Sequence, residues 1–259
     1  MKNNSTAGLL AALDEERRAS GTADPDSGVV RETAPDGSEC RIVFARCTEQ
    51  DAGSVLRAET ARADALGHVL EWKLYGHDVP AGMGSRLRAA GFVPEEEEKV
   101  LVLPVSEGAA AAFEAPAYDI RRAGDARGLD DVAEISRDLG RRNVEEERRR
   151  LELSLRDAPG EMSVHVAYVD GVPAACGRVY YRPGGAFAEL AGGRTRPAYR
   201  KRGLFTALVA ARLREAVARG RTHAVVDALP TSEPTLTKRG FVCVTTTRPF
   251  VYEPGARAE

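Results

Sequence analysis

The sequence predicts an α/β chain made of two related lobes, the N-terminal one shortened. Runs rich in β-branched residues alternate with helical patterns along most of the 259 residues, which is typical of this class. The segments LRAAGFV (residues 87–93) and LTKRGFV (residues 236–242) share the spacing of Leu, Gly, Phe and Val. We interpret this similarity as an internal repeat. The alternative is a chance likeness between two helix ends and the strand starts that follow them.

Composition limits the classes of function. The formal net charge is −2, so no global basic field attracts nucleic acid or an acidic membrane. No apolar run approaches the ~20 residues of a transmembrane helix, and the N-terminus lacks the apolar core of a signal peptide. We therefore expect a cytoplasmic protein without nucleic-acid or membrane partners. The four scattered cysteines and four isolated histidines predict reduced core thiols and no metal site.

The N-terminal half predicts a short series of elements. Residues 1–27 form at most a short amphipathic helix and a linker rich in Ser, Gly, Asp and Pro, so we expect a flexible segment. Residues 28–116 form the shortened lobe, which opens with two β-prone runs around the turn Pro35-Asp36-Gly37. Its remaining elements are a helix over 48–66, a strand over 69–76, a helix over 81–91 and a strand over 97–105.

The C-terminal lobe, residues 117–259, predicts a longer series. A helix begins at Asp125 or Asp130 and ends at Gly140, and a charged, exposed helix follows. Three strands lie between residues 162 and 195. The helix over 204–219 is apolar all round in its first half and should be buried. The remaining elements are a strand over 223–229, a short helix over 232–240 capped by Ser232, and β structure over 241–254.

The stretch RPAYRKRGLF (residues 196–205) places three consecutive cations and a glycine at the start of that buried helix. The unbonded N–H groups of a helix start, together with the helix dipole, form an anion site. Gly203 allows close backbone approach, Arg200 and Arg202 add bidentate donors, and Lys201 adds a point charge. The alternative is a solvated basic turn. The strand–loop–helix context favours a pyrophosphate site.

This stretch resembles the acyl-CoA-binding motif of the GNAT superfamily of N-acyltransferases, Val-x-Pro-x-Tyr-(Arg/Gln)-x-x-Gly-x-(Gly/Ala). Pro197, Tyr199, Arg200 and Gly203 match by position, and the resemblance extends over residues 118–254. It implies a mixed, mostly antiparallel sheet flanked by helices, with a second, smaller GNAT-like lobe at the N-terminus. The corresponding loop of that lobe, RCTEQDAG, is acidic, so we expect a single cofactor site.

The resemblance also implies the donor, the acceptor and the residues that hold the donor. The donor is acetyl-CoA or another acyl-CoA, and the acceptor is the amine of a small molecule. The backbone before the loop binds the pantetheine arm and the N–H groups of the loop bind the pyrophosphate. The residues so implied are Gly193, Arg194, Thr195, Arg200, Lys201, Arg202, Gly203, Leu204, Phe205, Thr206 and Ser232. Independently of any family, Gly192-Gly193 inside a strand predicts a bulge or the close approach of another chain.

Two residues depart from the family pattern. Phe205 stands where the family prefers Gly or Ala, which narrows or displaces the phosphate pocket. Leu236 stands where many members carry the tyrosine that protonates the leaving thiolate. The resemblance therefore implies an enzyme that lacks this general acid.

Acyl transfer to an amine needs a base, because an alkyl ammonium has a pKa of roughly 10.4. Glu189 lies six residues before Thr195, where several family members carry a catalytic glutamate, and strand alternation places it on one face with Gly193. Asp227 on the neighbouring strand is the second candidate. The alternative for each is a solvent-facing or capping carboxylate. A backbone N–H near Gly193 or Arg194 would polarise the carbonyl.

Three interpretations of function remain open. The first is an N-acetyltransferase that uses acyl-CoA and a small amine. The second is an acyltransferase whose donor is bound to an acyl carrier protein, with the basic stretch meeting an acidic carrier. The third is a non-catalytic module that binds acyl-CoA, which would not need Glu189. The acceptor, the acyl chain and the oligomeric state are not predicted.

Overall fold

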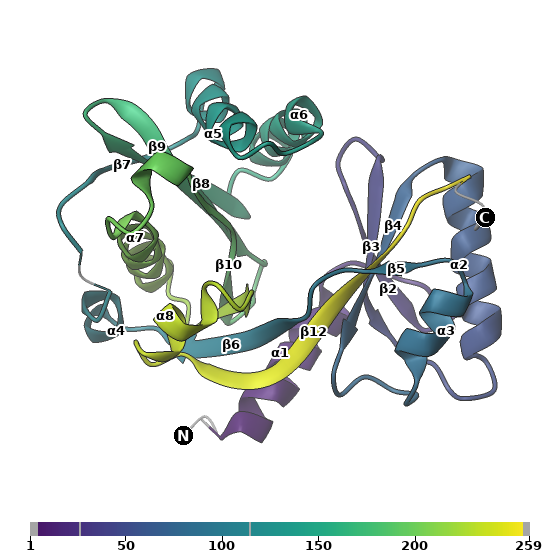
Figure 1. The fold of residues 1–259 in the computed structure, drawn as a ribbon. Coiled ribbons are helices and arrows are strands. Elements are labelled where there is room, and N and C mark those ends of the chain that lie inside the picture. The colour runs from purple at the N-terminus through teal and green to yellow at the C-terminus, as the bar shows by residue number, and fades with distance from the viewer. Residues whose placement is uncertain (1–4, 26, 114, 256–259) are drawn as a thin grey trace. The chain divides into compact units, whose positions relative to one another are not determined.

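The computed structural model describes residues 5–25, 27–113 and 115–255 (Figure 1). The chain divides into two compact units. The N-terminal unit comprises residues 1–100, 228–233 and 243–259, and the C-terminal unit comprises residues 101–227 and 234–242. The division therefore differs from the single boundary between residues 116 and 117 that the sequence suggested.

In the N-terminal unit the strands follow the order β1-β2-β3-β4-β12, with β5 paired to β12. β3 and β4 are parallel and the other pairs are antiparallel. Its elements are α1 (Thr6–Ala19), β1 (Thr22–Ala23), β2 (Val29–Thr33), β3 (Glu39–Ala45), α2 (Ala52–Leu66), β4 (Val69–Tyr75), α3 (Met83–Ala89), β5 (Val93–Pro94) and β12 (Val242–Tyr252).

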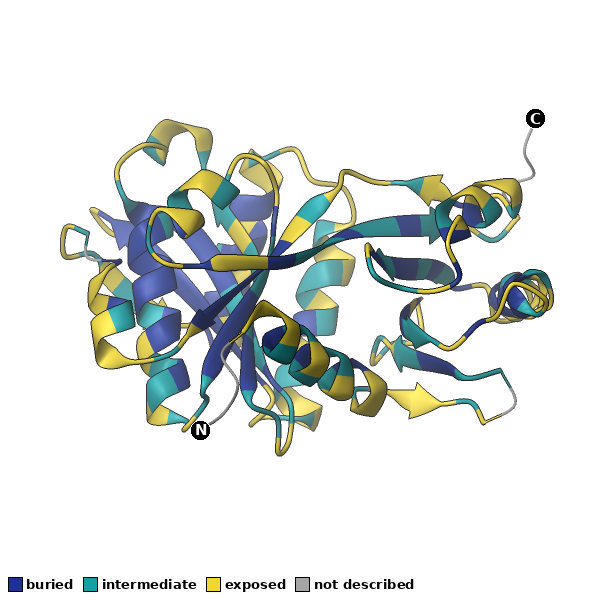
Figure 2. Cartoon of the chain, turned by 90° about the horizontal axis from the view of Figure 1, so that it is seen from below, coloured by how far each residue is buried: buried dark blue, intermediate teal, exposed yellow. Residues whose placement is uncertain are grey.

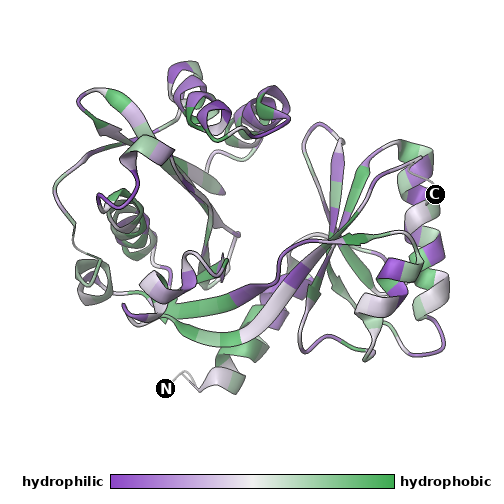
Figure 3. Ribbon diagram, in the orientation of Figure 1, coloured by the Kyte–Doolittle hydropathy of each residue, from purple (hydrophilic) through white to green (hydrophobic). Residues whose placement is uncertain are grey.

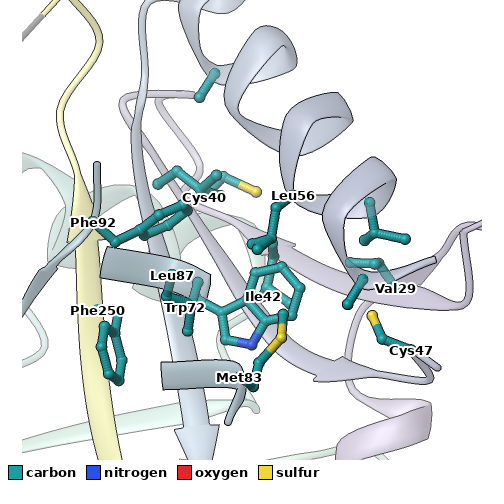
Figure 4. Packing of buried hydrophobic residues seen from close by; sticks show 14 residues of the cluster. Val29, Cys40, Ile42, Cys47, Leu56, Trp72, Met83, Leu87, Phe92 and Phe250 are labelled. Atoms are coloured by element: carbon teal, nitrogen blue, oxygen red, sulfur yellow. The ribbon is translucent and has the colours of Figure 1, made fainter. Parts of the chain in front are cut away.

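The core of this unit lies between the sheet and the helices α2 and α3. Trp72 of β4 packs with Leu56 of α2 and Leu87 of α3, as Figure 4 shows. Phe92 and Phe250 close the same cluster. The core thus uses residues from both ends of the sequence, since Phe250 comes from β12.

The segment expected to be flexible, residues 1–27, is folded over its described residues. Leu9 and Leu13 of α1 are buried. Arg17, also buried, donates to Val43 O and to the carboxylate of Asp78. β1 pairs with β2. The segment is ordered because its apolar face and its buried arginine find partners in β3 and in the residues after β4, which lie far away in sequence.

The C-terminal unit is a sheet in the order β6-β11-β10-β9-β8-β7. The strands from β7 to β10 are antiparallel neighbours, and β10 and β11 are parallel. Its elements are β6 (Glu98–Pro104), α4 (Glu107–Ala111), β7 (Asp119–Arg122), α5 (Ala126–Asp138), α6 (Val144–Asp157), β8 (Met162–Val169), β9 (Val172–Tyr181), β10 (Phe187–Thr195), a 3-10 turn (Pro197–Tyr199), α7 (Leu204–Ala218), β11 (His223–Ala228) and α8 (Glu233–Thr237).

Helices cover both faces of this sheet. α5 and α6 pack on one face with Cys176, and α7 packs on the other through Leu204 and Leu208. α7 is mostly apolar and α6 largely polar in Figure 3. β8 is buried along its whole length, and buried strands flanked by helices with exposed outer faces are visible in Figure 2. The buried first half of α7 confirms the sequence prediction.

Local signals determine several element boundaries. The side chain of Asp125, not Asp130, caps α5 by accepting from Gly128 N at 2.8 Å. Ser106 caps α4 by accepting from Ala109 N at 3.0 Å. The sequence analysis missed α4, although a serine before an alanine-rich run is a helix-start signal.

The repeated segments adopt the same local structure. Leu87 and Leu236 are fully buried. Phe92 N donates to Leu87 O at 3.0 Å, and Phe241 N donates to Leu236 O at 3.2 Å. The intervening glycines both have positive φ. Each segment therefore ends a helix and starts a strand in the same way.

The strand that follows each repeated segment belongs largely to the other unit. β12 follows α8 in sequence but pairs with β4 in the N-terminal unit. β6 follows β5 in sequence, yet its residues from Leu101 onward belong to the C-terminal unit beside β11. This exchange is the reason why the units do not coincide with the two halves of the sequence.

Candidate functional site

β10 separates from β11, its parallel neighbour, partway along its length. It pairs with β11 only from Phe187 to Glu189, but it stays paired with β9 as far as Thr195. The register with β9 shifts between Ala191 and Arg194, and Gly192 has φ 58°. The bulge predicted from the two glycines is therefore present. Beyond Glu189, the β11 side of β10 has no strand partner among the described residues.

The loop after β10 leads into α7 with its backbone donors unused. Gly203, the N-cap residue, has φ 89° and makes no side-chain capping bond. The first helical bond is from Ala207 N to Gly203 O, at 2.9 Å. Within the part of the chain that the structure describes, no N–H from Lys201 to Thr206 donates to a protein group. Such a series of N–H groups at a helix start is an anion-binding arrangement.

The three cations of the loop are exposed. Arg200, Lys201 and Arg202 make no ion pair with any described carboxylate. Lys201 has φ 61°, a left-handed conformation that is uncommon for non-glycine residues. Tyr118 holds the loop by donating its hydroxyl to Arg202 O. Arg196, in contrast, is bound to Glu134 and Asp138 of α5. The charge of the three exposed cations thus remains available to an external anion.

Phe205 lies against the bulge. Its ring is 3.5 Å from the position that a Cβ of Gly193 would occupy. Leu204 and Thr206, on either side of it, are buried in the helix. The aromatic ring therefore packs on β10, in a space that the absence of a side chain at Gly193 leaves open.

The two candidate bases share one face of the sheet. Glu189 pairs with Val225 in the parallel register, and Asp227 lies two residues further along β11. Residues in register, and residues two apart, point to the same side. Ala191 also belongs to this face and lies opposite Arg178, whose side chain reaches Glu147 of α6. The carboxylates therefore project on the side covered by α5 and α6.

The side chain of Arg194 is bound to α6. Its guanidinium donates to the two carboxylate oxygens of Glu147 at 2.6 and 2.7 Å and to Ser136 Oγ at 2.7 Å. Burial raises the pKa of Glu147, but the hydrogen bond and charge of Arg194, with a contribution from Arg178, lower it to about 2. A fixed ion pair thus connects α6 to the bulged strand.

Glu147 was missed by the sequence analysis, which took α6 to be an exposed helix. The helix does bury one face, through Leu151. A signal was present in the sequence, because Glu147 lies four residues before Leu151 and shares its helix face.

Leu236 and Ser232 fall in different units, so each is described by its own local contacts. Leu236 is 1% exposed and packs in the core of the C-terminal unit, so the place of the family's tyrosine offers no hydroxyl. Ser232 falls in the N-terminal unit, and its hydroxyl donates to Leu229 O at 3.2 Å. The expected cap on α8 is wrong, because among the described residues no backbone N–H of α8 donates to the Ser232 hydroxyl.

The described residues also bear on whether the protein has a metal site, a membrane-spanning helix or buried thiols. Within residues 5–25, 27–113 and 115–255, no group of three or more His, Cys, Asp or Glu side chains is placed to hold a metal ion. No helix in those ranges combines the length and apolar character needed to cross a membrane. Cys40, Cys47 and Cys176 are buried free thiols, whereas Cys243 is exposed, contrary to the expectation of a core thiol.

Comparison with known proteins places this geometry in context. Residues 129–241 match the model of the acetyltransferase (GNAT) family. A comparison with curated proteins gives no match.

Three solved structures have the same fold. A GCN5-related N-acetyltransferase from Kribbella flavida is 17% identical over 97% of this chain and 96% of its own, with a TM-score of 0.67. A conserved protein of unknown function from Staphylococcus epidermidis is 12% identical over 91% and 95%, with a TM-score of 0.68. A tandem GNAT protein from the clavulanic acid biosynthesis pathway is 15% identical over 85% and 77%, with a TM-score of 0.59. The predicted fold, a mixed and mostly antiparallel GNAT-like sheet with a second lobe, is confirmed.

Proposed function

Residues 129–241 of the chain form a GNAT acetyltransferase domain, and from this premise we propose that the protein transfers an acetyl or short acyl group from acyl-CoA to the amine of a small molecule. The family uses acyl-CoA as the donor. The acceptor and the residues of the site are the part that we propose.

The observation that carries the proposal is the start of α7. Six successive N–H groups, Lys201 to Thr206, have no acceptor among the described residues, and the side chains of Arg200, Lys201 and Arg202 are exposed beside them. A pyrophosphate supplies the charge and the acceptor oxygens that such a site lacks. The unpaired side of β10 beyond Glu189 suits the pantetheine arm, which would bind there as an additional strand.

We assign the general base to Glu189, with Asp227 as the second candidate. Both are half-buried on the same face of the sheet. The base removes a proton from the amine as nitrogen attacks the thioester carbon, the C–N bond forms and the C–S bond breaks. Backbone N–H groups at the bulge stabilise the negative charge that develops on the carbonyl oxygen.

The leaving thiolate then takes its proton from water, because buried Leu236 offers none. A thiol has a pKa of about 8.5, so a thiolate is a much better leaving group than an alkoxide. The absence of the family's tyrosine therefore lowers the rate without removing the activity.

A carrier-protein donor is the second candidate function. The exposure of Arg200, Lys201 and Arg202 favours it, since an acidic carrier surface could meet the same three cations. A non-catalytic acyl-CoA-binding module is the third, and buried Leu236 favours it.

Calorimetric titration with acetyl-CoA, CoA and 3′-dephospho-CoA tests the proposal. We expect micromolar binding, followed by thiol release when a panel of small amines is added. Binding without thiol release for any amine would favour the binding module. No binding of acetyl-CoA would exclude the proposed donor, and titration with an acylated carrier protein would then test the second candidate.

A further inference from the structure

A buried arginine lies beneath the bulge of β10. Arg212 of α7 is 2% exposed, and it makes no ion pair with any carboxylate in the described part of the chain. Within the described residues, its guanidinium bonds only to backbone carbonyls, those of Leu208 at 3.0 Å, Arg178 at 3.1 Å and Ala191 at 3.4 Å. Burial lowers its pKa to about 10, which leaves it charged at neutral pH. Burial of a cation without an anionic partner costs folding free energy. A functional role would explain why an arginine is kept at this position.

The strands are shaped around this guanidinium. Ala191 pairs with Arg178, and pairing resumes at Arg194 and Cys176, so that Gly177 faces the two residues of the bulge. A Cβ on Gly177 would lie 3.0 Å from the Arg212 guanidinium. The ladder is therefore interrupted, and a side chain is absent, at the place where the guanidinium lies.

The peptide between Ala191 and Gly192 connects Arg212 to the bulge of β10. In a trans peptide the carbonyl and the N–H point in opposite directions. Because the carbonyl of Ala191 accepts from Arg212, the N–H of Gly192 points away from the guanidinium. The side chains of Glu189 and Ala191 lie on the face of the sheet that α5 and α6 cover.

Resting on the proposed function, we infer that Arg212 is a positioning residue for acyl transfer. It polarises the peptide between Ala191 and Gly192 and holds the bulge so that the N–H of Gly192 binds the thioester oxygen. A cation bonded to a carbonyl makes the N–H of the same peptide a stronger donor, since hydrogen-bonded groups polarise one another in a low-dielectric interior. The hydrogen bond from the N–H of Gly192 strengthens as negative charge develops on the thioester oxygen. It therefore stabilises the transition state more than the ground state, which accelerates the reaction.

A purely structural role is the alternative, and R212M separates the two. Methionine fills similar space without the charge, and removal of a buried charge that has no anionic partner also removes the free-energy cost of burying it. We expect R212M to keep its thermal midpoint and its affinity for acetyl-CoA while kcat falls about tenfold, less than the 10²–10³ for loss of a direct oxyanion donor. R212K should recover part of the rate. The control is R214M, because Arg214 is exposed on the same helix.

A spectroscopic measurement tests the inference without turnover. The carbonyl stretch of bound ¹³C-labelled acetyl-CoA should shift to lower frequency in the wild-type protein and in R214M, and return toward its solution value in R212M. G177A displaces the guanidinium without removing its charge. In this variant the carbonyl frequency should also move toward its solution value, but by a smaller amount than in R212M. G177A and R212K keep the test open if R212M does not fold.

The outcomes distinguish the inference from its premise. Wild-type protein that fails to bind acetyl-CoA would overturn the proposed donor and the role of Arg212 with it. If the wild-type protein binds acetyl-CoA, and R212M has the same carbonyl frequency and kcat as the wild type, only the role of Arg212 is overturned. A lower thermal midpoint in R212M, with unchanged kcat and frequency, would assign Arg212 to structure.

Discussion

The helices α2 and α7 occupy equivalent places, each between two parallel strands, but they begin in opposite ways. α7 starts at Gly203 with unused N–H groups and three exposed cations. α2 starts at Asp51, whose carboxylate accepts from Thr48 N at 2.6 Å, and Thr48 O and Asp51 O accept from the first N–H groups of the helix. A carboxylate in that place repels a phosphate, whereas the α7 loop attracts one.

This comparison shows that the fold alone does not make a phosphate site. Both units supply a strand, a turn and a helix, and only a few residues before the helix decide whether its N–H groups remain available. In the N-terminal unit, Arg31 forms a buried ion pair with Glu59 of α2. The structure therefore supports one donor site, in the C-terminal unit.

The largest expected effect comes from Gly203→Glu. A carboxylate at the start of α7, in a left-handed conformation that side chains rarely adopt, should abolish acetyl-CoA binding in calorimetry. The matched control is Gly53→Glu in α2, which should bind as the wild type does. If a folded Gly203→Glu protein binds acetyl-CoA normally, the donor site lies elsewhere.

Removal of the base should have the next largest effect. Glu189→Gln should lower kcat by about 10²–10³ and leave the dissociation constant of acetyl-CoA unchanged, because a positioned base typically contributes 10²–10⁴. Steady-state kinetics and calorimetry measure the two quantities. Asp227→Asn is the comparison variant. If it loses more activity than Glu189→Gln, the two assignments must be exchanged.

Loss of the three cations should weaken binding less completely than Gly203→Glu. The triple change of Arg200, Lys201 and Arg202 to Gln leaves the N–H groups in place. Each exposed charge contributes roughly 0.2–1 kcal/mol, so we expect the affinity for acetyl-CoA to fall by about 3–150-fold. The salt dependence of binding should become flatter. Unchanged affinity and salt dependence would identify the stretch as a solvated turn.

Glu147→Gln should change the acid dependence of stability in the C-terminal unit. The pKa of Glu147 is lowered to about 2 in the folded protein, so its contribution is present above its ordinary pKa and is lost as the pH falls from about 5 toward 2. At neutral pH the variant should lose up to about 3 kcal/mol. The gap between its urea unfolding free energy and that of the wild type should close in acid.

Glu145→Gln is the control for that experiment, since Glu145 pairs with Arg137 at an exposed site and such pairs contribute little. Equal pH profiles for Glu147→Gln and the wild type would show that the buried pair does not stabilise the fold.

Asp51→Asn should have the smallest effect. It removes the carboxylate at the start of α2, but Thr48 O and Asp51 O still accept from the first N–H groups of that helix. We expect no second acetyl-CoA site, so the calorimetric stoichiometry should remain one per chain. A stoichiometry of two would mean that charge alone separates the two helix starts.

The sequence by itself determined the features that depend on neighbouring residues. The order of most strands and helices follows from their periodicity, the cap at Asp125 from its position before a helical run, and the loop before α7 from Gly203 and its cations. Gly192-Gly193 predicted the bulge. These features are local, because φ preferences and capping bonds act over a few residues.

The tertiary structure alone decided the rest. Four features depend on residues that are distant in sequence. They are the exchange of β6 and β12, the packing of α1, the ion pair of Glu147 with Arg194, and the burial of the Arg212 guanidinium. No local pattern specifies such pairings, since a strand edge or a buried guanidinium can be satisfied by many partners. The partner is selected when the whole core packs, because only then does each buried polar group have to find its acceptor.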